Sequence, residues 1–327
     1  MSSIAPALET LCRRIAELGG VEVTALGILD RAGQLSLAAP GRVSPNGACR
    51  LVRAADGWIA MNLARDEDRE LVPVWLGGED IEAGVAGRRR RELVADAELL
   101  GMPVASVGEI AAAPLEPPRL RMAAPALRAR RPKVLDLSAL WAGPMCGAIL
   151  AAAGAEVVRV ESLSRPDPTR IHTPELFARL NGAKAELALD LSRDEGKAQL
   201  RASIRDADVV ITSARARGLA SLGIDLPTAL GARPGRVWVA ITGYGLFGEG
   251  AMRVAFGDDA AAAGGLIRST PDGPEFLGDA LADPVTGLGA AAAALTALAK
   301  GGGVLVDAAM ARCAAGAATL CGLGRAA

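Results

Sequence analysis

The sequence predicts an α/β protein with two domains: a larger one built on a doubly wound, mostly parallel sheet, and a smaller α+β domain before it. Two observations support this prediction. After residue 133, short β-branched runs alternate with helical segments, the pattern of a parallel sheet covered by helices on both faces. Before residue 116, two strand-like runs flank a tight turn, and helical segments follow them.

Residues 1–115 are expected to form the small α+β domain. The segment 1–18 reads as a helix with polar residues along one face. Strands are expected on either side of the turn at 55–57, and helices near 66–77 and 88–101.

A linker is expected at 116–133, because prolines and arginines gather there without a steady apolar period. The remaining residues, 134–327, are expected to form a Rossmann-like domain. Its strands are expected at 133–138, 155–162, 186–191, 207–213 and 236–242. Sheets of this kind bind ligands beyond the carboxyl ends of their strands, so the residues that follow these runs are the first candidates for a site.

Composition limits the class of protein. The chain has 327 residues, of which 51% are hydrophobic and 22% charged, as expected for a folded chain with more than one core. The formal net charge of −1, with one short basic run at 87–93 and no broad basic face, argues against nucleic acid or an anionic membrane surface as a partner.

The five cysteines have no CxxC spacing, which argues against both a disulfide framework and a metal site. The N-terminus lacks the apolar core of a signal peptide, and the apolar run 287–299 is too short to span a bilayer. We therefore expect a cytoplasmic protein that neither holds a metal nor enters a membrane.

The first strand–helix–strand unit, 134–161, carries small residues where its helix begins. Gly143 and Gly147 would let backbone amides approach a phosphate or pyrophosphate there. However, Gly143-Pro144 breaks the GxGxxG spacing, so a nicotinamide cofactor is not expected.

In sequence order, seven blocks resemble the family III CoA-transferases, the group that also contains the α-methylacyl-CoA racemases. The blocks are "VLDLSALWAGP", "GAEVVRVES" with "RPDPTR", "FARLNGAKAELALDL", "DADVVITSARARGLASLGI", "VAITGYGLFG", "FLGDALADPVTGLGAAAAALTAL" and "GGGVLVDAAMARCAAGAA". The resemblance implies an enzyme that moves CoA from an acyl-CoA to a carboxylic acid, with no permanently bound cofactor. It also implies a homodimer, and the small-residue run "GLGAAAAALTAL" would suit close packing between elements.

The first half also resembles this family, in a different order. The stretches 41–63 and 99–114 are similar to the family's small domain, which usually follows the large domain but precedes it here. The chain therefore resembles a circular permutation of the family, or one half of a longer ancestor.

The resemblance assigns the catalytic nucleophile to Asp283, within "LADPVTG". A carboxylate there would attack the thioester and give a mixed anhydride, and the released CoA thiolate would return to give an aspartyl-CoA thioester. The apolar neighbours of Asp283 would keep the carboxylate weakly hydrated. A solvated surface charge is the alternative interpretation.

The family places a second acid or a histidine in the block "AFGDDAAAAGGL". Asp258 is the nearest counterpart and Asp259 is adjacent, although alignment on the "GG" puts Gly257 at this position. Either acid could instead cap the helix that follows. Racemases of the family use a histidine here, whereas the single histidine of this chain, His172, is expected in a loop. A transferase is therefore favoured, with a racemase or a non-catalytic CoA-binding subunit as alternatives.

Coenzyme A is assigned by resemblance to two regions. The turn that would line the pantetheine and thioester end consists of Trp141, Ala142, Gly143 and Pro144. The adenine and phosphates would lie near Leu189, Ser192 and Arg193. Ser162 stands where relatives often carry a basic residue, and substitutes for that charge would be Arg165, Arg170, Arg215 or Arg217. The loop 42–47 is either a counterpart of the family's mobile glycine loop or a plain turn.

Overall fold

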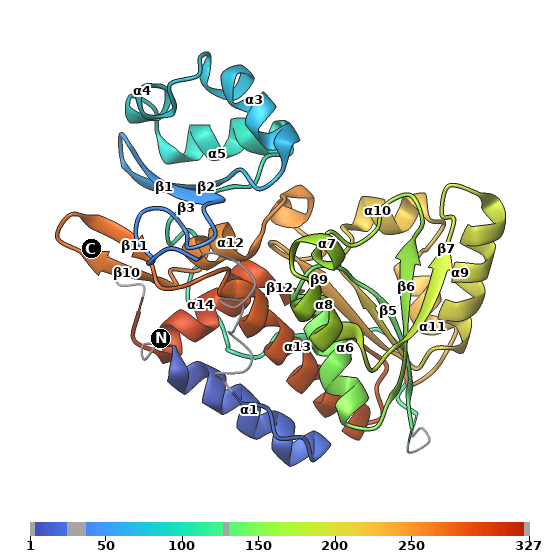
Figure 1. The fold of residues 1–327 in the computed structure, drawn as a ribbon. Helices are drawn as coiled ribbons and strands as arrows, with labels where there is room; N and C mark the ends of the chain where they lie inside the picture. Colours follow the sequence, from blue (N-terminus) through green and yellow to red (C-terminus); the bar gives the residue numbers. More distant parts are fainter. Residues whose placement is uncertain (1–3, 25–36, 127–130, 324–327) are drawn as a thin grey trace.

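A seven-stranded sheet forms the centre of the larger part of the molecule (Figure 1). The computed structural model describes residues 4–24, 37–126 and 131–323. In spatial order the strands are β4 (Arg119–Arg121), β12 (Val304–Ala309), β9 (Val237–Thr242), β8 (Val209–Thr212), β5 (Lys133–Leu137), β6 (Glu156–Ser162) and β7 (Ala185–Leu189). All neighbouring pairs are parallel except β4 with β12. The strand order reverses direction between β5 and β8, which confirms the predicted doubly wound sheet.

Helices cover both faces of this sheet, as its apolar strands require. Every residue of β8, β9 and β12 is buried, because neither side of these strands faces water. One face is covered by α6 (Ala142–Ala152), α8 (Pro174–Asn181), α13 (Ala282–Ala299) and α14 (Met310–Leu320). The other face is covered by α9 (Asp194–Asp206), α10 (Ala216–Ser221) and α11 (Leu226–Gly231).

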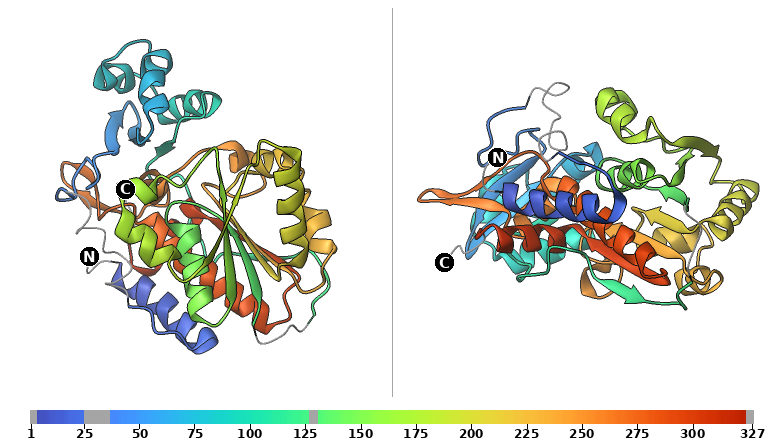
Figure 2. Two further views of the ribbon diagram at one scale, coloured as in Figure 1. Left: turned by 45° about the vertical axis from the view of Figure 1, so that its right-hand side comes forward. Right: turned by 90° about the horizontal axis from the view of Figure 1, so that it is seen from below.

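A smaller unit stands beside the sheet with a core of its own (Figures 1 and 2). Its three antiparallel strands are β1 (Cys49–Ala54), β2 (Gly57–Asn62) and β3 (Val104–Ser106). They pack with α3 (Asp66–Leu76), α4 (Ile81–Ala86) and α5 (Arg90–Leu99). The strand–turn–strand unit and the two helices expected near 66–77 and 88–101 are present.

The smaller unit is fixed to the larger one by a shared apolar patch and an ion pair. The patch joins β1 and β2 to α12 (Gly257–Ala263) and to the hairpin of β10 (Ile267–Thr270) and β11 (Gly273–Phe276). In addition, the Arg253 guanidinium donates to Glu109 Oε1 at 2.6 Å and to Val104 O at 3.1 Å. These contacts set the distance between the two walls of the cleft described below.

The N-terminal helix lies outside the smaller unit, which differs from the expected 1–115 boundary. Helix α1 (Ala5–Gly19) packs along α13 and α14 on the larger unit (Figure 2). Its apolar face, with Leu8, Leu11 and Ile15, is buried in the same core as Leu288 of α13. The pattern of residues identified an amphipathic helix, but an amphipathic pattern does not specify which surface the helix covers.

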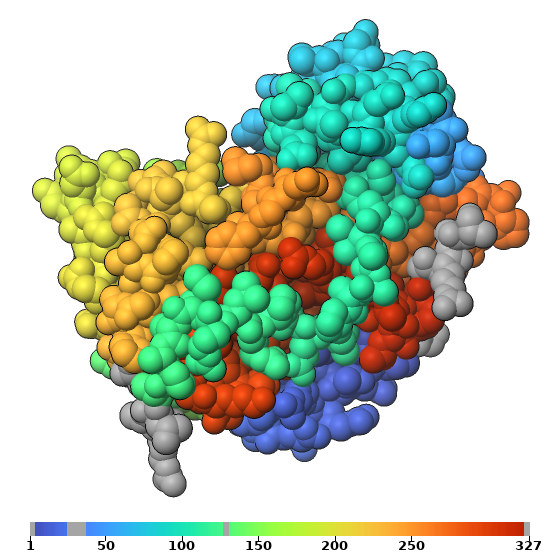
Figure 3. All heavy atoms as spheres, turned by 180° about the vertical axis from the view of Figure 1, so that it is seen from behind, coloured from blue at the N-terminus to red at the C-terminus, as the bar shows by residue number. Residues whose placement is uncertain are grey.

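The expected linker 116–133 also differs, because part of it belongs to the sheet. Residues 119–121 form β4, an exposed antiparallel edge strand on β12, and Met122 N donates to Gly303 O at 3.0 Å. The segment crosses the back of the larger unit above the C-terminal elements (Figure 3). Prolines are tolerated here because an edge strand leaves half of its amides unpaired.

Helix α13 is long and apolar enough to cross a membrane by length and composition, but 83% of it is buried inside the structure. It packs against α1, α6 and α14 within one core. Its small-residue face therefore allows close packing between elements, as expected, and these elements belong to the same chain. The homodimer itself stays a prediction that rests on the family resemblance.

Candidate functional site

A cleft of about 580 Å³ lies between the smaller unit and the carboxyl-end side of the sheet. Its walls come from the loop 46–48 and α3 on one side, and from α7 (Thr169–His172), α8 and the start of α6 on the other. The beginnings of α12 and α13 complete it. Its polar and aromatic side chains are Asn46, Asn62, Arg65, Arg69, Trp141, Thr169, His172, Phe256, Asp258 and Asp283.

Asp283, the predicted nucleophile, lies in this cleft at the first turn of α13. Its amide donates to Ala280 O at 2.9 Å, and its side chain is half-buried. The partial positive charge at the N-terminus of the helix stabilises a carboxylate in this position. The neighbours Leu281, Ala282 and Val285 are buried, so apolar packing surrounds the base of the side chain.

Gly257 lies directly against the Asp283 carboxylate. A Cβ atom on Gly257 would lie 2.2 Å from Asp283 Oδ2 and 2.6 Å from Ala280 O. No side chain fits between these groups without displacing the carboxylate or the turn before it. Of the three residues 257–259 that the sequence left open, the one closest to Asp283 is therefore the glycine.

Asp258 is also in the cleft wall, and its carboxylate is committed to hydrogen bonds. Oδ1 accepts from Ala280 N at 2.7 Å, and Oδ2 accepts from Asn46 Nδ2 at 2.8 Å. Burial raises the pKa of Asp258 to about 6, although the hydrogen bonds from Asn46 and Ala280 act in the opposite direction. The Ala280 that it holds has a φ of 46°, so this carboxylate fixes a strained turn three residues before Asp283.

Asp259 is fully buried and does not line the cleft. Its Oδ1 accepts from Phe256 N at 2.9 Å and from Asn62 Nδ2 at 3.0 Å, which caps the start of α12. Burial raises the pKa of Asp259 well above its ordinary value. The geometry thus favours the capping interpretation for Asp259 over contact with a substrate.

Asn46 connects the smaller unit to this acidic cluster. Its amide nitrogen donates to Asp258 Oδ2 at 2.8 Å and to Asp279 Oδ1 at 2.6 Å, and its Oδ1 accepts from Ala48 N at 2.8 Å. The side chain therefore holds the loop 46–48 against the start of α12 and the turn before α13. This loop includes Gly47, which lines the cleft.

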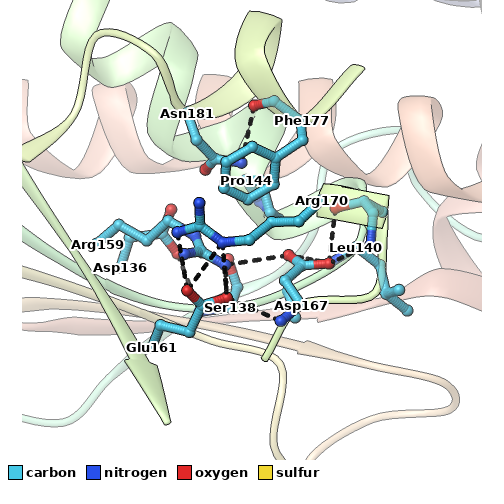
Figure 4. Close-up of polar contacts among 12 residues, drawn as sticks. Asp136, Ser138, Leu140, Pro144, Arg159, Glu161, Asp167, Arg170, Phe177 and Asn181 are labelled. Atoms are coloured by element: carbon cyan, nitrogen blue, oxygen red, sulfur yellow. Dashed lines mark hydrogen bonds and ion pairs between the residues drawn. The ribbon is translucent and has the colours of Figure 1, made fainter. Parts of the chain in front are cut away.

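The turn that carries Trp141 is fixed by a second buried network (Figure 4). Leu140, which precedes Trp141, has a φ of 70°, and its amide donates to Asp167 Oδ2 at 3.1 Å. Asp167 Oδ1 accepts from Thr169 Oγ1 at 2.7 Å. Asp167 thus ties the turn before α6 to the start of α7, and both segments line the same cleft.

Two arginines hold the network together around one aromatic ring (Figure 4). Arg159 and Arg170 lie 4.9 and 4.2 Å from the centre of the Phe177 ring. Both donate to Glu161. Burial disfavours the charged form of Glu161, but these hydrogen bonds outweigh it and lower its pKa to about 2. Arg170 also donates to Glu186 at 2.7 Å, so its guanidinium is engaged with two carboxylates, and its expected contact with a phosphate stays a prediction.

A buried ion pair fixes the beginning of α6. Lys184 Nζ lies 2.8 Å from Asp136 Oδ2, donates to Pro144 O at 2.8 Å, and both side chains are fully buried. Gly147 makes room for it, because a Cβ there would lie 2.6 Å from Asp136 Oδ2. All four residues of the predicted CoA turn are buried: Trp141, Ala142, Gly143 and Pro144. Of these, Trp141 also lines the cleft.

A second hollow of about 150 Å³ lies at the point where the strand order reverses. It is lined by the ends of β5 and β8 and by Ser162 and Arg165. Ser162 Oγ lies 3.1 Å from Ser164 Oγ. The hollow occupies the position at which doubly wound sheets bind ligands.

The remaining residues assigned to coenzyme A do not line either cavity. Leu189 is buried in the core on β7, and its expected place near the adenine stays a prediction. Arg193 lies 3.8 Å from Asp190, and Arg215 donates to Met252 O at 2.8 Å. These two arginines and Arg217 are exposed, and their contact with CoA stays a prediction.

The structure brings residues into the cleft that the sequence did not assign to it. His172 is exposed at the end of α7 and lines the same cleft as Asp283. Arg65 is the N-cap residue of α3, and Arg69 lies in its first turns. Their i,i+4 spacing in the sequence could have predicted that both lie on one face of the helix. Within 4–24, 37–126 and 131–323, no three His, Cys, Asp or Glu side chains gather as a metal site would require.

Comparison with known proteins identifies one family. The model of CoA-transferase family III matches residues 131–320. A succinyl-CoA–D-citramalate CoA-transferase from Chloroflexus aurantiacus is 31% identical over 189 residues, 54% of this chain and 47% of that protein. An α-methylacyl-CoA racemase from Mus musculus is 36% identical over 116 residues, 36% of this chain and 28% of that protein.

A solved structure shares the fold. The crystal structure of a CAIB/BAIF family protein from Brucella suis is 28% identical, with a TM-score of 0.51, and the match covers 62% of this chain and 56% of that one. The chain spans about half the length of the curated transferase that it matches.

Proposed function

Because the chain belongs to CoA-transferase family III, we propose that it moves coenzyme A from an acyl-CoA to a carboxylic acid through an aspartyl-CoA intermediate on Asp283. The observation that supports this proposal most strongly is the placement of Asp283. Its carboxylate lines a cleft large enough for a thioester and an acid. It also lies at the N-terminus of α13 and directly against Gly257.

The proposed reaction proceeds through two pairs of acyl transfers at Asp283. The carboxylate attacks the thioester carbonyl, which forms a mixed anhydride and releases CoA thiolate. The thiolate attacks the aspartyl carbonyl of the anhydride, so the donor acid leaves and aspartyl-CoA remains. The acceptor carboxylate then attacks aspartyl-CoA, and the thiolate released in that step takes the acceptor acyl group and restores Asp283.

The same proposal gives coenzyme A a path along the carboxyl end of the sheet. The thioester end would lie beside Trp141 in the cleft, and the nucleotide end would extend toward the hollow with Ser162 and Arg165. Asp258 would act as a positioning residue, since it fixes the Ala280 turn through a 2.7 Å hydrogen bond.

The test is the substitution Asp283→Asn, assayed with a panel of acyl-CoA donors and carboxylic acids. We expect transfer to fall by several orders of magnitude, because an amide cannot form the anhydride. Asp272→Asn, an exposed acid outside the cleft, is the matched control. Wild-type protein treated with acyl-CoA and then borohydride should be modified at Asp283 in a peptide map. A variant that keeps more than about a tenth of wild-type transfer, a loss below ~1.4 kcal/mol, would exclude Asp283 as the nucleophile.

A racemase is the second candidate, and His172 is the observation that favours it. The histidine and Asp283 line the same cleft, and moving a proton between the two faces of the α-carbon of an acyl-CoA needs two bases. Incubation with a 2-methylacyl-CoA in deuterated water separates the two activities. Deuterium at the α-carbon that disappears in His172→Gln would support the racemase, whereas CoA transfer without exchange supports the transferase. Binding of CoA without either activity would support the non-catalytic subunit.

A further inference from the structure

Two arginines form one wall of the cleft, and the proposed reaction does not use them. Arg65 is the N-cap residue of α3, and Arg69 follows one helical turn later, about 6 Å along the same face. Both come from the smaller unit. The hollow with Ser162 and Arg165, by contrast, is lined only by residues of the larger unit, between 137 and 222.

The contacts of Arg65 place this wall relative to Asp283. Its guanidinium lies 5.6 Å from the centre of the Phe256 ring, and Phe256 precedes the Gly257 that abuts the Asp283 carboxylate. Asp68, which is almost fully buried, accepts from Arg65 Nε at 2.8 Å, and Gly101 O accepts from Nη2 at 3.2 Å. Arg65 is therefore held in place by the protein, and Arg69 lies farther along α3.

Arg69 is held much less firmly. Among the described residues its ion-pair partner is Asp66, whose side chain is 89% exposed, and the Arg69 side chain is itself 54% exposed. An exposed pair of this kind contributes less than about 1 kcal/mol, so a ligand anion can replace Asp66 at little cost. A guanidinium binds a carboxylate through two parallel hydrogen bonds.

From this arrangement we propose that Arg69, one helical turn beyond Arg65 on the cleft wall, binds a second anionic group on the acceptor acid, such as the second carboxylate of a dicarboxylic acid. One carboxylate reacts at Asp283 and the other contacts Arg69 across the cleft. The identification of this ligand as the acceptor rests on the function proposed above, whereas the anion subsite itself does not.

The test compares two acids of equal chain length, glutarate with two carboxylates and pentanoate with one. Binding of each acid is measured by calorimetry on the full chain, for wild type, Arg69→Gln and Arg91→Gln. Arg91 is an exposed arginine on α5 outside the cleft, which makes it the matched control. We expect Arg69→Gln to weaken glutarate binding at least tenfold and to change pentanoate binding less than twofold. Arg69→Lys should recover part of the loss, and Arg91→Gln should bind both acids as wild type does.

Three results would overturn the proposal: unchanged glutarate binding, equal losses for both acids, or a raised KM for acyl-CoA with both acids unaffected. The last result would assign Arg69 to the phosphates of coenzyme A. Because acid binding does not require turnover, a selective loss of glutarate binding in a protein without transfer activity would keep the subsite and reject the transferase. CoA transfer at the wild-type rate in Arg69→Gln would instead keep the transferase and reject the subsite.

Discussion

At the scale of single residues, the most constrained position in the cleft is Gly257. We predict that Gly257→Ala lowers transfer strongly, because its Cβ would lie 2.2 Å from Asp283 Oδ2. Overpacking of this kind also costs about 1–3 kcal/mol of stability. The control is Gly231→Ala at the end of α11, where a Cβ would meet nothing within 4 Å and should not lower stability. Transfer rates measure the effect on activity, and urea midpoints measure the effect on stability. A Gly257→Ala variant with wild-type turnover would contradict the prediction, because it would show that the Asp283 carboxylate has room to move.

Asp258 makes the stability of the fold depend on pH. Its pKa in the folded protein is about 6, above its ordinary value, so the folded state holds the proton more tightly than the unfolded chain does. The contribution of this group to stability is therefore fully present below about pH 4, and it is lost, on the order of 2–3 kcal/mol, as the pH rises through about 6. Asp259 acts in the same direction.

We predict that Asp258→Asn removes a large part of this slope. Urea unfolding of wild type and variant at several pH values between about 4 and 7 measures the difference. The variant should be less stable at every pH, because both Asp258 oxygens accept hydrogen bonds, from Asn46 Nδ2 and Ala280 N. The NH₂ group of an asparagine at 258 would replace one of these acceptors with a donor. Equal slopes in the two proteins would contradict the assignment.

At the scale of elements, the start of α6 depends on the Lys184–Asp136 pair. We predict that Lys184→Met costs roughly 3–5 kcal/mol, since it leaves Asp136 as a buried carboxylate without its cation. Lys300→Met, on the exposed residue after α13, should stay within about 0.5 kcal/mol of wild type. The free energy of unfolding from urea titrations measures both. A cost as small as that of Lys300→Met would contradict the prediction that α6 depends on this ion pair.

The elements also show how far the sequence could be used for prediction. Runs such as "VVIT" and "VWVAIT" identified β8 and β9 because a strand buried on both faces needs continuous apolar residues. The docking of α1 was not predictable, because its apolar face could have covered either unit. His172 was assigned to a loop, and it enters the cleft wall because Asp167 fixes the start of α7 against Leu140. Such a contact joins residues 27 positions apart and leaves no local pattern.

At the scale of the whole molecule, the family resemblance predicts a homodimer. Light scattering at micromolar concentration measures the mass, and a dimer should have about twice the 33.3 kDa of one chain. A monomer of that mass would contradict the prediction. The interface is not the small-residue face of α13, which is buried within the chain.

The path of the chain between the two units has a mechanical consequence. The chain begins on the larger unit with α1, forms the smaller unit between residues 41 and 106, and returns across the back of the larger unit. The smaller unit therefore has two covalent attachments to the same body. Besides these two attachments, the Asn46 amide donates to Asp258 and Asp279 of the larger unit. Because Asn46 and α3 belong to the same twice-attached unit, the width of the cleft and the position of the two arginines are set together by one docked body.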